Sequence, residues 1–387
     1  MDVIQALNGV FHHFELAREL ESRGYLKRIY STFPWKRLKR EGVPQELVRT
    51  FPWLHPPLLL LERHYRLPKR VSRDLHFASF ELFDAWISRR IEDCDALVAL
   101  SGSGLKTGAA VQGRGGKYIC DRGSSHIRYQ NAIVSEEYAR WGFAIEACDP
   151  RMIEREESEY AMADAITVPS EFSRRTFIEM GVPAKKLHKI PYGVRLERFR
   201  RTSEPPRDSF EVLFAGTVSL RKGVPYLLEA FRLLNHPKKR LRIAGPVLPE
   251  MKVLLGRQDL TGIEVLGRIP QERLAQCMGT SHVMVLPSIE EGLALVQGQA
   301  LACGCPLISS YNTGGADIFT DGVEGFLVPI RSAAAIASRL QELAADEAMQ
   351  ERMSEAALRR VTSIGGWRDY GAQYAEFLKK LTQPPRL

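Results

Sequence analysis

Two charged pairs stand at strand-to-helix turns in the second half of the sequence. The stretch FAGTVSLRKG places Arg221 and Lys222 after an apolar, strand-like run and just before a helix that we expect to begin near Pro225. Lysine and arginine side chains, together with the N–H groups of a helix N-terminus, suit a bound diphosphate. On this string alone, an exposed basic surface is an equally good interpretation.

The second pair is acidic and lies in LPSIEEGLALVQGQALACG, where Glu290 and Glu291 follow the apolar run HVMVLPS. A carboxylate in such a loop can accept hydrogen bonds from two sugar hydroxyls, while the N–H groups of residues 292–295 face a phosphate. Either glutamate also fits a simpler role, as a charge that caps the helix N-terminus. Gln299 follows Glu291 by about two helical turns.

These residues need a scaffold, and the whole sequence alternates short apolar runs with amphipathic helical stretches, as parallel βα units do. A second series of such units begins at FEVLFAGTV, after the charged string RRTSEPPRDS, which we interpret as a linker. We therefore predict an α/β protein with two Rossmann-like, doubly wound domains, residues 1–190 and 191–365, facing a central cleft. Helix 366–387 is expected to pack back on the first domain. Ligands bind beyond the carboxyl ends of such strands, so the cleft is the expected site.

The order of several motifs resembles the retaining glycosyltransferases of family 4, which have the GT-B fold. The resemblance rests on Pro287-Ser288 followed by Glu291-Gly292, then ALACGCPLISS and GGADIFTDGVEGFLVP, with FAGTVSLRKG, RIAGP, VLGRIP and KIPYGVRLERF as supporting pieces. It covers nearly all of the second half and, weakly, the first. It implies a hexosyltransferase-type enzyme that moves a sugar from a nucleotide-diphosphate sugar to an acceptor hydroxyl with retention, in glycan, polysaccharide or glycolipid synthesis.

The resemblance also implies roles for individual residues of the second half. Arg221 and Lys222 would bind the donor diphosphate, and Glu291 would contact hydroxyls of the transferred sugar. The remaining donor-binding residues that we expect are Gly216, Arg268, Ile269, Gly292, Leu293, Ala294, Leu295 and Gln299. Among these, the backbone of residues 268–269 would hold the nucleotide base, the N–H groups of residues 292–295 the sugar and phosphate, and the amide of residue 299 the ribose.

Two residues of the first half match the family less closely. Gly9 in LNGVFHHF stands in the place of the glycine-rich loop beside donor and acceptor, and His126 in CDRGSSHIRYQ matches a histidine that approaches the anomeric centre. The catalytic residues predicted in this way are His126, Glu291, Arg221 and Lys222. A polar loop or core residue is the plainer interpretation of His126.

Three departures from the family pattern affect these assignments. Gln299 stands where a second glutamate usually binds the ribose, Gly9 is single rather than paired, and Thr217 replaces a common arginine. An amide loses the charge-assisted hydrogen bonds of a carboxylate, so Gln299 costs donor binding about 1–2 kcal/mol. Arg221 must then supply the charge that Thr217 lacks.

The only DxD spelling that we consider for a metal, Asp93-Cys94-Asp95, leads into a strand-like run instead of following one. We therefore expect no metal site and no cofactor, with the nucleotide-diphosphate sugar as a substrate and a metal-independent reaction. Two alternatives stay open: a catalytically weak scaffold that binds nucleotide sugars, and a sugar-nucleotide epimerase of the same fold.

The net charge of +8 comes mostly from the first 200 residues and is densest between Arg18 and Arg40. No nucleic-acid-binding motif accompanies this charge, so we expect no nucleic acid partner. WKRLKR at residues 35–40 suggests peripheral contact with an anionic membrane that carries a sugar or lipid-linked acceptor, although a solvated helix face and a soluble acceptor remain alternatives. Without an apolar span or a secretory signal pattern, a cytoplasmic protein is expected, and peripheral contact with the inner face of the membrane is a further hypothesis.

Overall fold

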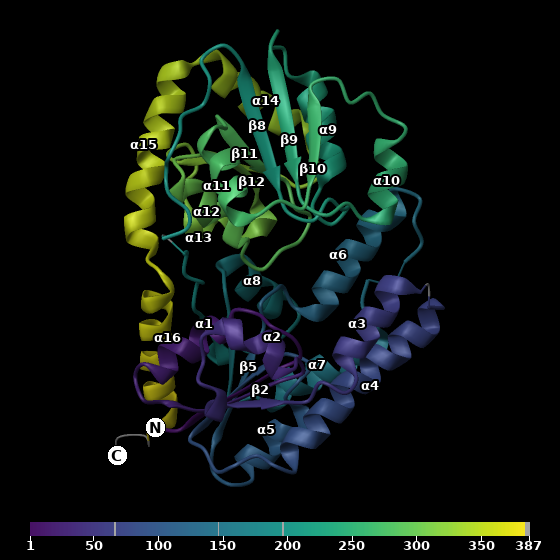
Figure 1. Ribbon diagram of the computed structural model, residues 1–387, viewed down its shortest axis with the longest axis vertical. Coiled ribbons are helices and arrows are strands. Elements are labelled where there is room, and N and C mark those ends of the chain that lie inside the picture. The colour runs from purple at the N-terminus through teal and green to yellow at the C-terminus, as the bar shows by residue number, and fades with distance from the viewer. Residues whose placement is uncertain (66, 146, 196, 384–387) are drawn as a thin grey trace.

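The computed structural model describes residues 1–65, 67–145, 147–195 and 197–383. It shows two parallel β-sheets, one in each half of the chain, with helices on both faces of each sheet (Figure 1). The α/β class and the GT-B architecture predicted from the sequence are confirmed. No helix among the described residues is both long enough and apolar enough to pass through a bilayer.

The first sheet has seven strands in the order β3-β2-β1-β4-β5-β6-β7, all paired in parallel. Its central strands are buried almost throughout, which explains why they read as continuous apolar runs such as VIQAL and ALVAL. The strands are β1 Val3–Leu7, β2 Leu26–Ser31, β3 Val48–Thr50, β4 Ala96–Leu100, β5 Lys117–Asp121, β6 Ala165–Val168 and β7 Leu187–Lys189. Its helices are α1 His13–Glu21, α2 Trp35–Leu38, α3 His55–His64, α4 Lys69–Ser88, α5 Leu105–Gln112, α6 Ile127–Arg140, α7 Pro150–Met162 and α8 Glu171–Glu179.

The second sheet has six parallel strands in the order β10-β9-β8-β11-β12-β13. Its strands are β8 Phe210–Ala215, β9 Lys239–Ala244, β10 Ile263–Gly267, β11 Val283–Leu286, β12 Leu307–Ser310 and β13 Gly325–Val328. The helices that follow are α9 Val224–Leu233, α10 Pro249–Leu255, α11 Gln271–Gly279, α12 Leu295–Ala302, α13 Gly315–Ile318, α14 Ala333–Ala345, α15 Glu347–Ile364 and α16 Trp367–Thr382.

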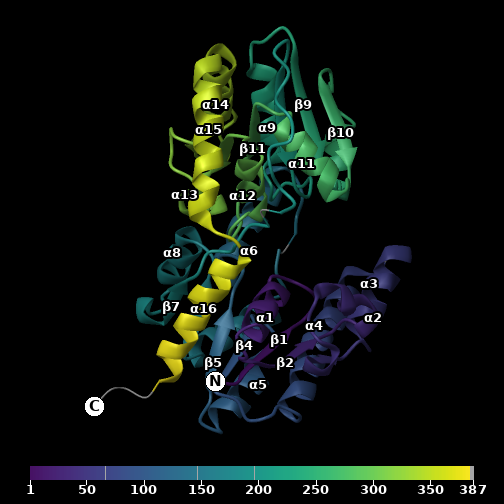
Figure 2. The ribbon, with the colours of Figure 1, turned by 60° about the vertical axis from the view of Figure 1, so that its left-hand side comes forward.

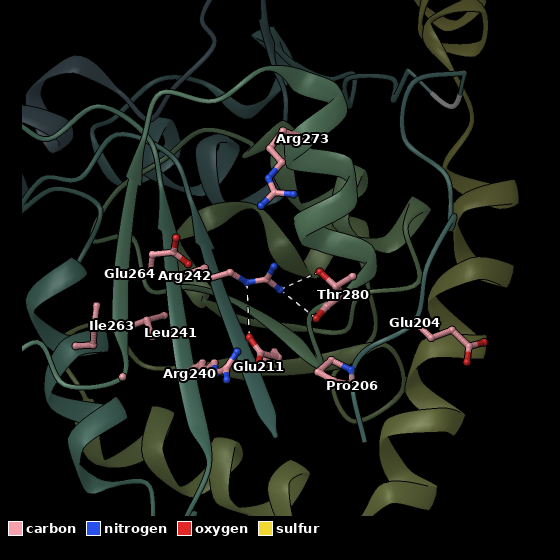
Figure 3. A pocket seen from close by; sticks show the side chains of 11 residues that line it. Glu204, Pro206, Glu211, Arg240, Leu241, Arg242, Ile263, Glu264, Arg273 and Thr280 are labelled. Carbon is pink, nitrogen blue, oxygen red and sulfur yellow. Dashed lines mark hydrogen bonds and ion pairs between the residues drawn. The ribbon is translucent and has the colours of Figure 1, made fainter. Parts of the chain in front are cut away.

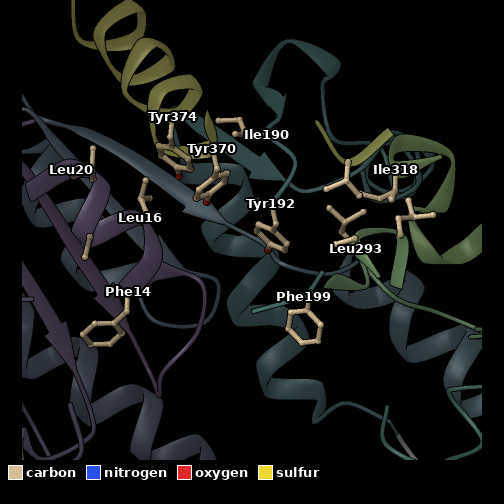
Figure 4. Close-up of a cluster of buried hydrophobic side chains, with 14 of the residues drawn as sticks. Phe14, Leu16, Leu20, Ile190, Tyr192, Phe199, Leu293, Ile318, Tyr370 and Tyr374 are labelled. Carbon is tan, nitrogen blue, oxygen red and sulfur yellow. The ribbon is translucent and has the colours of Figure 1, made fainter. Parts of the chain in front are cut away.

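One buried apolar cluster runs through both halves of the molecule (Figure 4). It begins between α1 and α16, with Phe14 and Tyr374, and continues through Tyr192 and Phe199 to Leu293 in the second half. Separate clusters fill the opposite face of each sheet. Because the shared cluster is continuous, the two halves pack against each other as well as being linked by the chain.

The chain passes twice between the two sheets, and the two crossings touch. Described residues 190–209 contain no helix or strand, and the second crossing joins α15 to α16. The N–H of Val194 donates to Gly365 O over 3.4 Å where the crossings meet. Beyond this point α16 lies along α1 of the first half (Figure 2), with the hydroxyl of Tyr374 3.1 Å from that of Thr167.

Candidate active site

The strand order of each sheet reverses at one place, between β1 and β4 in the first sheet and between β8 and β11 in the second. The loops that follow the two strands at such a switch point diverge and leave a crevice, where doubly wound proteins bind ligands. In the second sheet these loops are residues 216–223 and 287–294. They carry both charged pairs singled out in the sequence.

A glycine holds these two loops together. Gly223 has φ 65°, in the left-handed region, and any Cβ on it would overlap the carbonyl oxygen of Pro287. Only glycine fits this combination of backbone angle and close approach. The N–H of Ile289 also donates to Arg221 O over 2.8 Å, so the basic and acidic loops form one unit.

The four predicted charged residues form two ion pairs across this unit. Arg221 donates from Nε to Glu290 Oε2 over 2.9 Å, and Lys222 Nζ pairs with Glu291, which also accepts from the hydroxyl of Ser288 over 3.2 Å. The side chain of Lys222 is largely buried and that of Arg221 is partly exposed. This is not an exposed basic surface. It is a charge-balanced cluster at the mouth of the crevice.

Glu290 is fully buried and connects the two halves. Its carboxylate accepts from the hydroxyls of Ser124 over 2.7 Å and Ser125 over 2.5 Å, and from the amide of Gln130 over 3.0 Å, all in the first half. Burial alone would raise the pKa of this carboxyl, but the charge of Arg221 and the serine hydroxyls outweigh burial and lower the pKa to about 2. Glu290 is therefore an interdomain contact. The sequence alone could not distinguish this role from that of a helix cap.

Gly292 brings its backbone into close contact with the first half. A Cβ on Gly292 would overlap the carbonyl oxygen of Gly123, and Gly292 O accepts from the hydroxyl of Ser170 over 2.5 Å. Any larger residue at position 292 would push the two halves apart. The loop that carries Glu291 is thus fixed directly against the first half.

The predicted set of phosphate-binding N–H groups is only partly available. Helix α12 begins at Leu295, with Ala294 as its N-cap residue. The N–H of Ala294 donates to Thr313 O over 3.2 Å, so we remove Ala294 from the set of free donors. Gln299 lies half-buried on the second turn of α12.

The predicted base-binding residues Arg268 and Ile269 follow β10, at the same carboxyl edge of the sheet as the charged loops. This loop is linked to residues 216–223 through the residue that follows β9: the N–H of Gly245 donates to Gly267 O over 2.7 Å, and Gly245 packs against the carbonyl of Gly216. Arg268 is exposed and Ile269 half-buried. The structure therefore brings this loop to the edge of the crevice where a nucleotide would extend.

The ring of His126 does not join this cluster, and its surroundings favour a structural role over the catalytic role expected from the sequence. The ring is buried between those of Tyr160 and Phe177, each 5.0 Å away between centroids. Its Nδ1 accepts from the N–H of Arg128 over 3.2 Å and so caps α6. Burial lowers the pKa of His126 to about 4, which keeps the ring neutral. The residues of this loop that reach the site are the two preceding serines.

Sequence reasoning missed an imidazole–carboxylate group beside the switch point of the first sheet. Asp121 ends β5, and its Oδ2 lies 2.6 Å from His12 Nε2 and 3.3 Å from His13 Nε2. Despite burial, the two histidines and the Thr167 hydroxyl lower the pKa of Asp121. His12 also lies beside Gly123, which touches the Glu291 loop. The adjacent histidines after Gly9 were the only signal in the sequence.

Gly9 lies in the loop after β1 that leads to this group. Its φ is 118°, in the region that favours glycine, and its carbonyl accepts from the hydroxyl of Ser31 over 2.7 Å. The side chains of His12, His13 and Asp121 offer ligand atoms within 4.8 Å of one another, a group of the described residues that could hold a metal ion. Two of these ligand atoms, His12 Nε2 and Asp121 Oδ2, are paired with each other.

Two other features, the DxD segment and a pocket, lie at the amino ends of the strands, on the opposite edge of each sheet from the candidate site. Asp93 and Asp95 precede β4, at its amino end, and Asp95 accepts from the N–H of Asp2 over 2.6 Å. A pocket of about 660 Å³ lies at the amino ends of β8, β9 and β10 (Figure 3). There Arg242 donates to Thr280 O over 3.0 Å and its Nε lies 3.7 Å from Glu211. Neither feature can reach the charged loops at the carboxyl edges.

Helix α6 spans the junction at its far end. Glu137, fully buried, accepts from Arg331 Nε over 2.6 Å and from the hydroxyl of Tyr226 over 2.9 Å, and Tyr138 donates to Glu250 over 2.7 Å. Glu137 and Tyr138 belong to α6, whereas their partners Arg331, Tyr226 and Glu250 belong to the domain of the second sheet. The junction is therefore held by polar contacts on both sides of the charged cluster.

Comparison with known proteins finds a family match in the second half. Residues 196–360 match the model of glycosyl transferases group 1. The amylovoran biosynthesis glycosyltransferase AmsK of Erwinia amylovora is 24% identical over 234 residues, covering 57% of this chain and 58% of that relative, so the alignment spans little more than half of either protein.

Solved structures resemble the whole chain. Sucrose-phosphate synthase from Thermosynechococcus elongatus has a TM-score of 0.72 at 20% identity, covering 98% of this chain and 99% of that one. Anabaena Alr3699/HepE in complex with UDP and glucose has a TM-score of 0.71 at 16% identity, covering 98% and 100%. At these identities the likeness concerns the fold.

Proposed function

We propose, from the membership of residues 196–360 in the glycosyl transferases group 1 family, that this protein transfers a sugar from a nucleotide-diphosphate sugar to an acceptor hydroxyl in glycan synthesis. The observation that carries the proposal is the cluster of Arg221, Lys222, Glu290 and Glu291 at the switch point of the second sheet. HepE, which has the same fold, is described in complex with UDP and glucose. The names of other relatives refer to polysaccharide biosynthesis.

The basic residues act on the leaving group. As the bond between the anomeric carbon and the diphosphate breaks, negative charge grows on the phosphate oxygens, and fixed cations stabilise it. Lys222 and Arg221 stand on one loop and can meet two neighbouring phosphates. They supply positive charge that a divalent cation supplies in other enzymes, so we expect activity to persist in EDTA.

The two glutamates have different roles. Glu290 stays with Arg221 and the serines and holds the domains together, whereas Glu291 lies half-buried beside the crevice. Sugar hydroxyls that donate to Glu291 would take over the position of Lys222 Nζ and release that ammonium to the phosphate. Donor binding thus exchanges one ion pair for two ligand contacts.

The acceptor side is supplied by the first domain. The His12 and Asp121 pair lies beside Gly123, directly across from the Gly292 backbone. An acceptor hydroxyl that hydrogen-bonds to His12 would face the anomeric carbon from the side of the diphosphate. The departing phosphate oxygen can take the hydroxyl proton on that face, which gives retention without a side-chain nucleophile.

The test is a panel of UDP-, GDP- and ADP-sugars, with binding measured by calorimetry and slow donor hydrolysis by chromatography, with and without EDTA. One donor is expected to bind and hydrolyse slowly in the wild type. Glu291→Ala should lose hydrolysis and sugar-dependent affinity while it still binds the free nucleotide diphosphate. Lys252→Ala, on the exposed face of α10, is the control and should behave as wild type.

Other outcomes would favour the alternatives. Donor binding without turnover, in the presence of a broad set of glycan and lipid-linked acceptors, would favour a nucleotide-sugar-binding scaffold. Conversion of the donor into its epimer without any acceptor would favour an epimerase. Binding that ignores Glu291 would contradict the assignment of the sugar contact.

The acceptor that we propose is linked to a lipid at the inner face of a membrane. The basic first domain supports this proposal, since the excess of positive charge lies in the first 200 residues. In this arrangement a protein without a membrane-spanning helix would reach its acceptor by peripheral contact.

A further inference from the structure

A pair of helices, α3 and α4, projects from the first domain on the side away from α16 (Figure 2). Nearly half of the large apolar side chains that the described residues expose lie between residues 53 and 82. We call five of them, spread over residues 53–71, the hairpin patch: Trp53, Leu59, Leu60, Tyr65 and Val71. Trp53 is 74% exposed and Tyr65 66%. Apolar side chains gathered in this way on a surface mark an interaction site.

The charges around the hairpin patch are positive. Lys69 and Arg70 open α4 and are exposed beside Val71. The two nearby acids are already paired. Glu62 is turned between the two helices, where it accepts from the hydroxyl of Ser72 and lies 3.1 Å from His76 Nε2, and Asp74 on α4 pairs with Arg151 over 2.9 Å. An apolar surface rimmed by cations complements the interface of a bilayer that contains anionic lipids.

The basic segment 35–40, which the sequence suggested for membrane contact, is less suited to it. Trp35 is half-buried against the core, and Arg37 donates to Glu41 over 2.6 Å. This segment nevertheless adjoins the start of α3, because the rings of Phe33 and His55 pack edge to face 5.7 Å apart. Its exposed lysines therefore extend the positive rim of the hairpin patch.

We propose that the hairpin patch inserts into the interface of an anionic membrane and holds the protein there. In both views the tip of α3 stands at the height of the junction between the two domains (Figures 1 and 2). Insertion would therefore bring the junction to the lipid surface. Resting on the proposed function, this placement selects acceptors whose reacting hydroxyl lies at the headgroup level.

Flotation of the full chain with vesicles tests the proposal without any donor or turnover, so its outcome is independent of the transferase assignment. Vesicles of phosphatidylcholine alone are compared with vesicles that contain phosphatidylglycerol. The key variants are Leu60→Asp and Leu233→Asp, because both leucines are 58% exposed and only the first lies in the hairpin patch. Thermal unfolding of both variants checks that the fold is kept.

The wild type is expected to float with anionic vesicles and Leu233→Asp to float equally well. Leu60→Asp should lower the vesicle-bound fraction about tenfold, and Lys69→Glu with Arg70→Glu should lower it for anionic vesicles. Failure of the wild type to float, or equal losses in both leucine variants, would overturn the proposal. If the wild type fails to float and Leu60→Asp instead dissociates a dimer in sedimentation velocity, the patch contacts a second copy of the chain.

Discussion

The two sheets have the same kind of switch point, yet the side chains gathered beside it differ in their chemistry. In the second sheet two cations and two carboxylates balance each other at the mouth of the crevice, with Lys222 and Glu291 both within reach of a ligand. In the first sheet an imidazole and a carboxylate, His12 and Asp121, lie nearly buried. One crevice is suited to bind charge and the other to orient a neutral hydroxyl.

The difference indicates how the two domains would share the proposed transfer reaction. Diphosphate binding requires a cation that can exchange its present partner for a phosphate, and the ion pair of Lys222 with the partly exposed carboxylate of Glu291 allows this exchange. Orientation of a hydroxyl requires a fixed ring, and the packing of His12 against Tyr192, 4.3 Å between centroids, provides it. Glu290 joins the two halves through Ser124 and Ser125.

The largest effect is expected for Lys222→Ala. Loss of the cation that meets the leaving diphosphate should lower kcat/KM by about 10²- to 10³-fold in initial-rate assays with the preferred donor. Lys252→Ala is the control. A loss of less than about threefold for Lys222→Ala would mean that the second crevice does not bind the diphosphate.

Glu290→Gln tests the link between the halves. Removal of the charge opposite Arg221 in a buried site should lower the free energy of unfolding by about 3 kcal/mol at pH 7, measured in urea. Because the folded pKa of Glu290, about 2, is below that of an ordinary glutamate, its contribution is present above pH 4.5 and is lost as the pH falls toward 2.

The variant should therefore show a weaker dependence of stability on pH between 5 and 3 than the wild type. Glu291→Gln, at a half-buried position, is the matched comparison and should change stability less. Equal losses for the two variants would contradict the assignment of Glu290 as the interdomain contact.

His12→Gln examines the first crevice. Loss of an imidazole that hydrogen-bonds to the acceptor should lower kcat about 10- to 100-fold and leave the affinity for the free nucleotide diphosphate unchanged. Calorimetry with the nucleotide and rate measurements with the acceptor separate the two quantities. A parallel loss of nucleotide affinity would show that the substitution disturbs the fold of the site instead of removing a contact with the acceptor.

Gln299→Glu should improve donor binding. A carboxylate at this position of α12 would gain charge-assisted hydrogen bonds with ribose hydroxyls, worth about 1–2 kcal/mol, or roughly 5- to 30-fold in Kd. Calorimetric titration with the preferred donor measures the change, and titration with ribose-free diphosphate is the control. An unchanged Kd would mean that residue 299 does not contact the ribose.

The smallest change in activity is expected for His126→Ala. The ring is buried and caps α6, so the variant should lose about 1–2 kcal/mol of stability and keep kcat/KM within about threefold. Thermal unfolding and initial rates measure the two effects. A hundredfold loss of kcat/KM in a folded variant would restore the catalytic role expected from the sequence.

Local sequence patterns determined much about this protein. Apolar runs of strand length separated by amphipathic stretches specify parallel βα units, because buried parallel strands must be apolar on both faces. The placement of Arg221, Lys222 and Glu291 after such runs put them at the carboxyl ends of strands. This information is contained in neighbouring residues and can be read without contacts distant in sequence.

Tertiary structure alone decided which residues meet. His126 and Ser125 are adjacent, yet the first turns into the core while the second bonds to Glu290, because the side chains at a helix start point in different directions. His12 and Asp121, 109 residues apart, form a pair only because β1 and β5 end at the same edge of the sheet. Spacing along the chain carries no signal for such contacts, since they depend on how the strands are ordered.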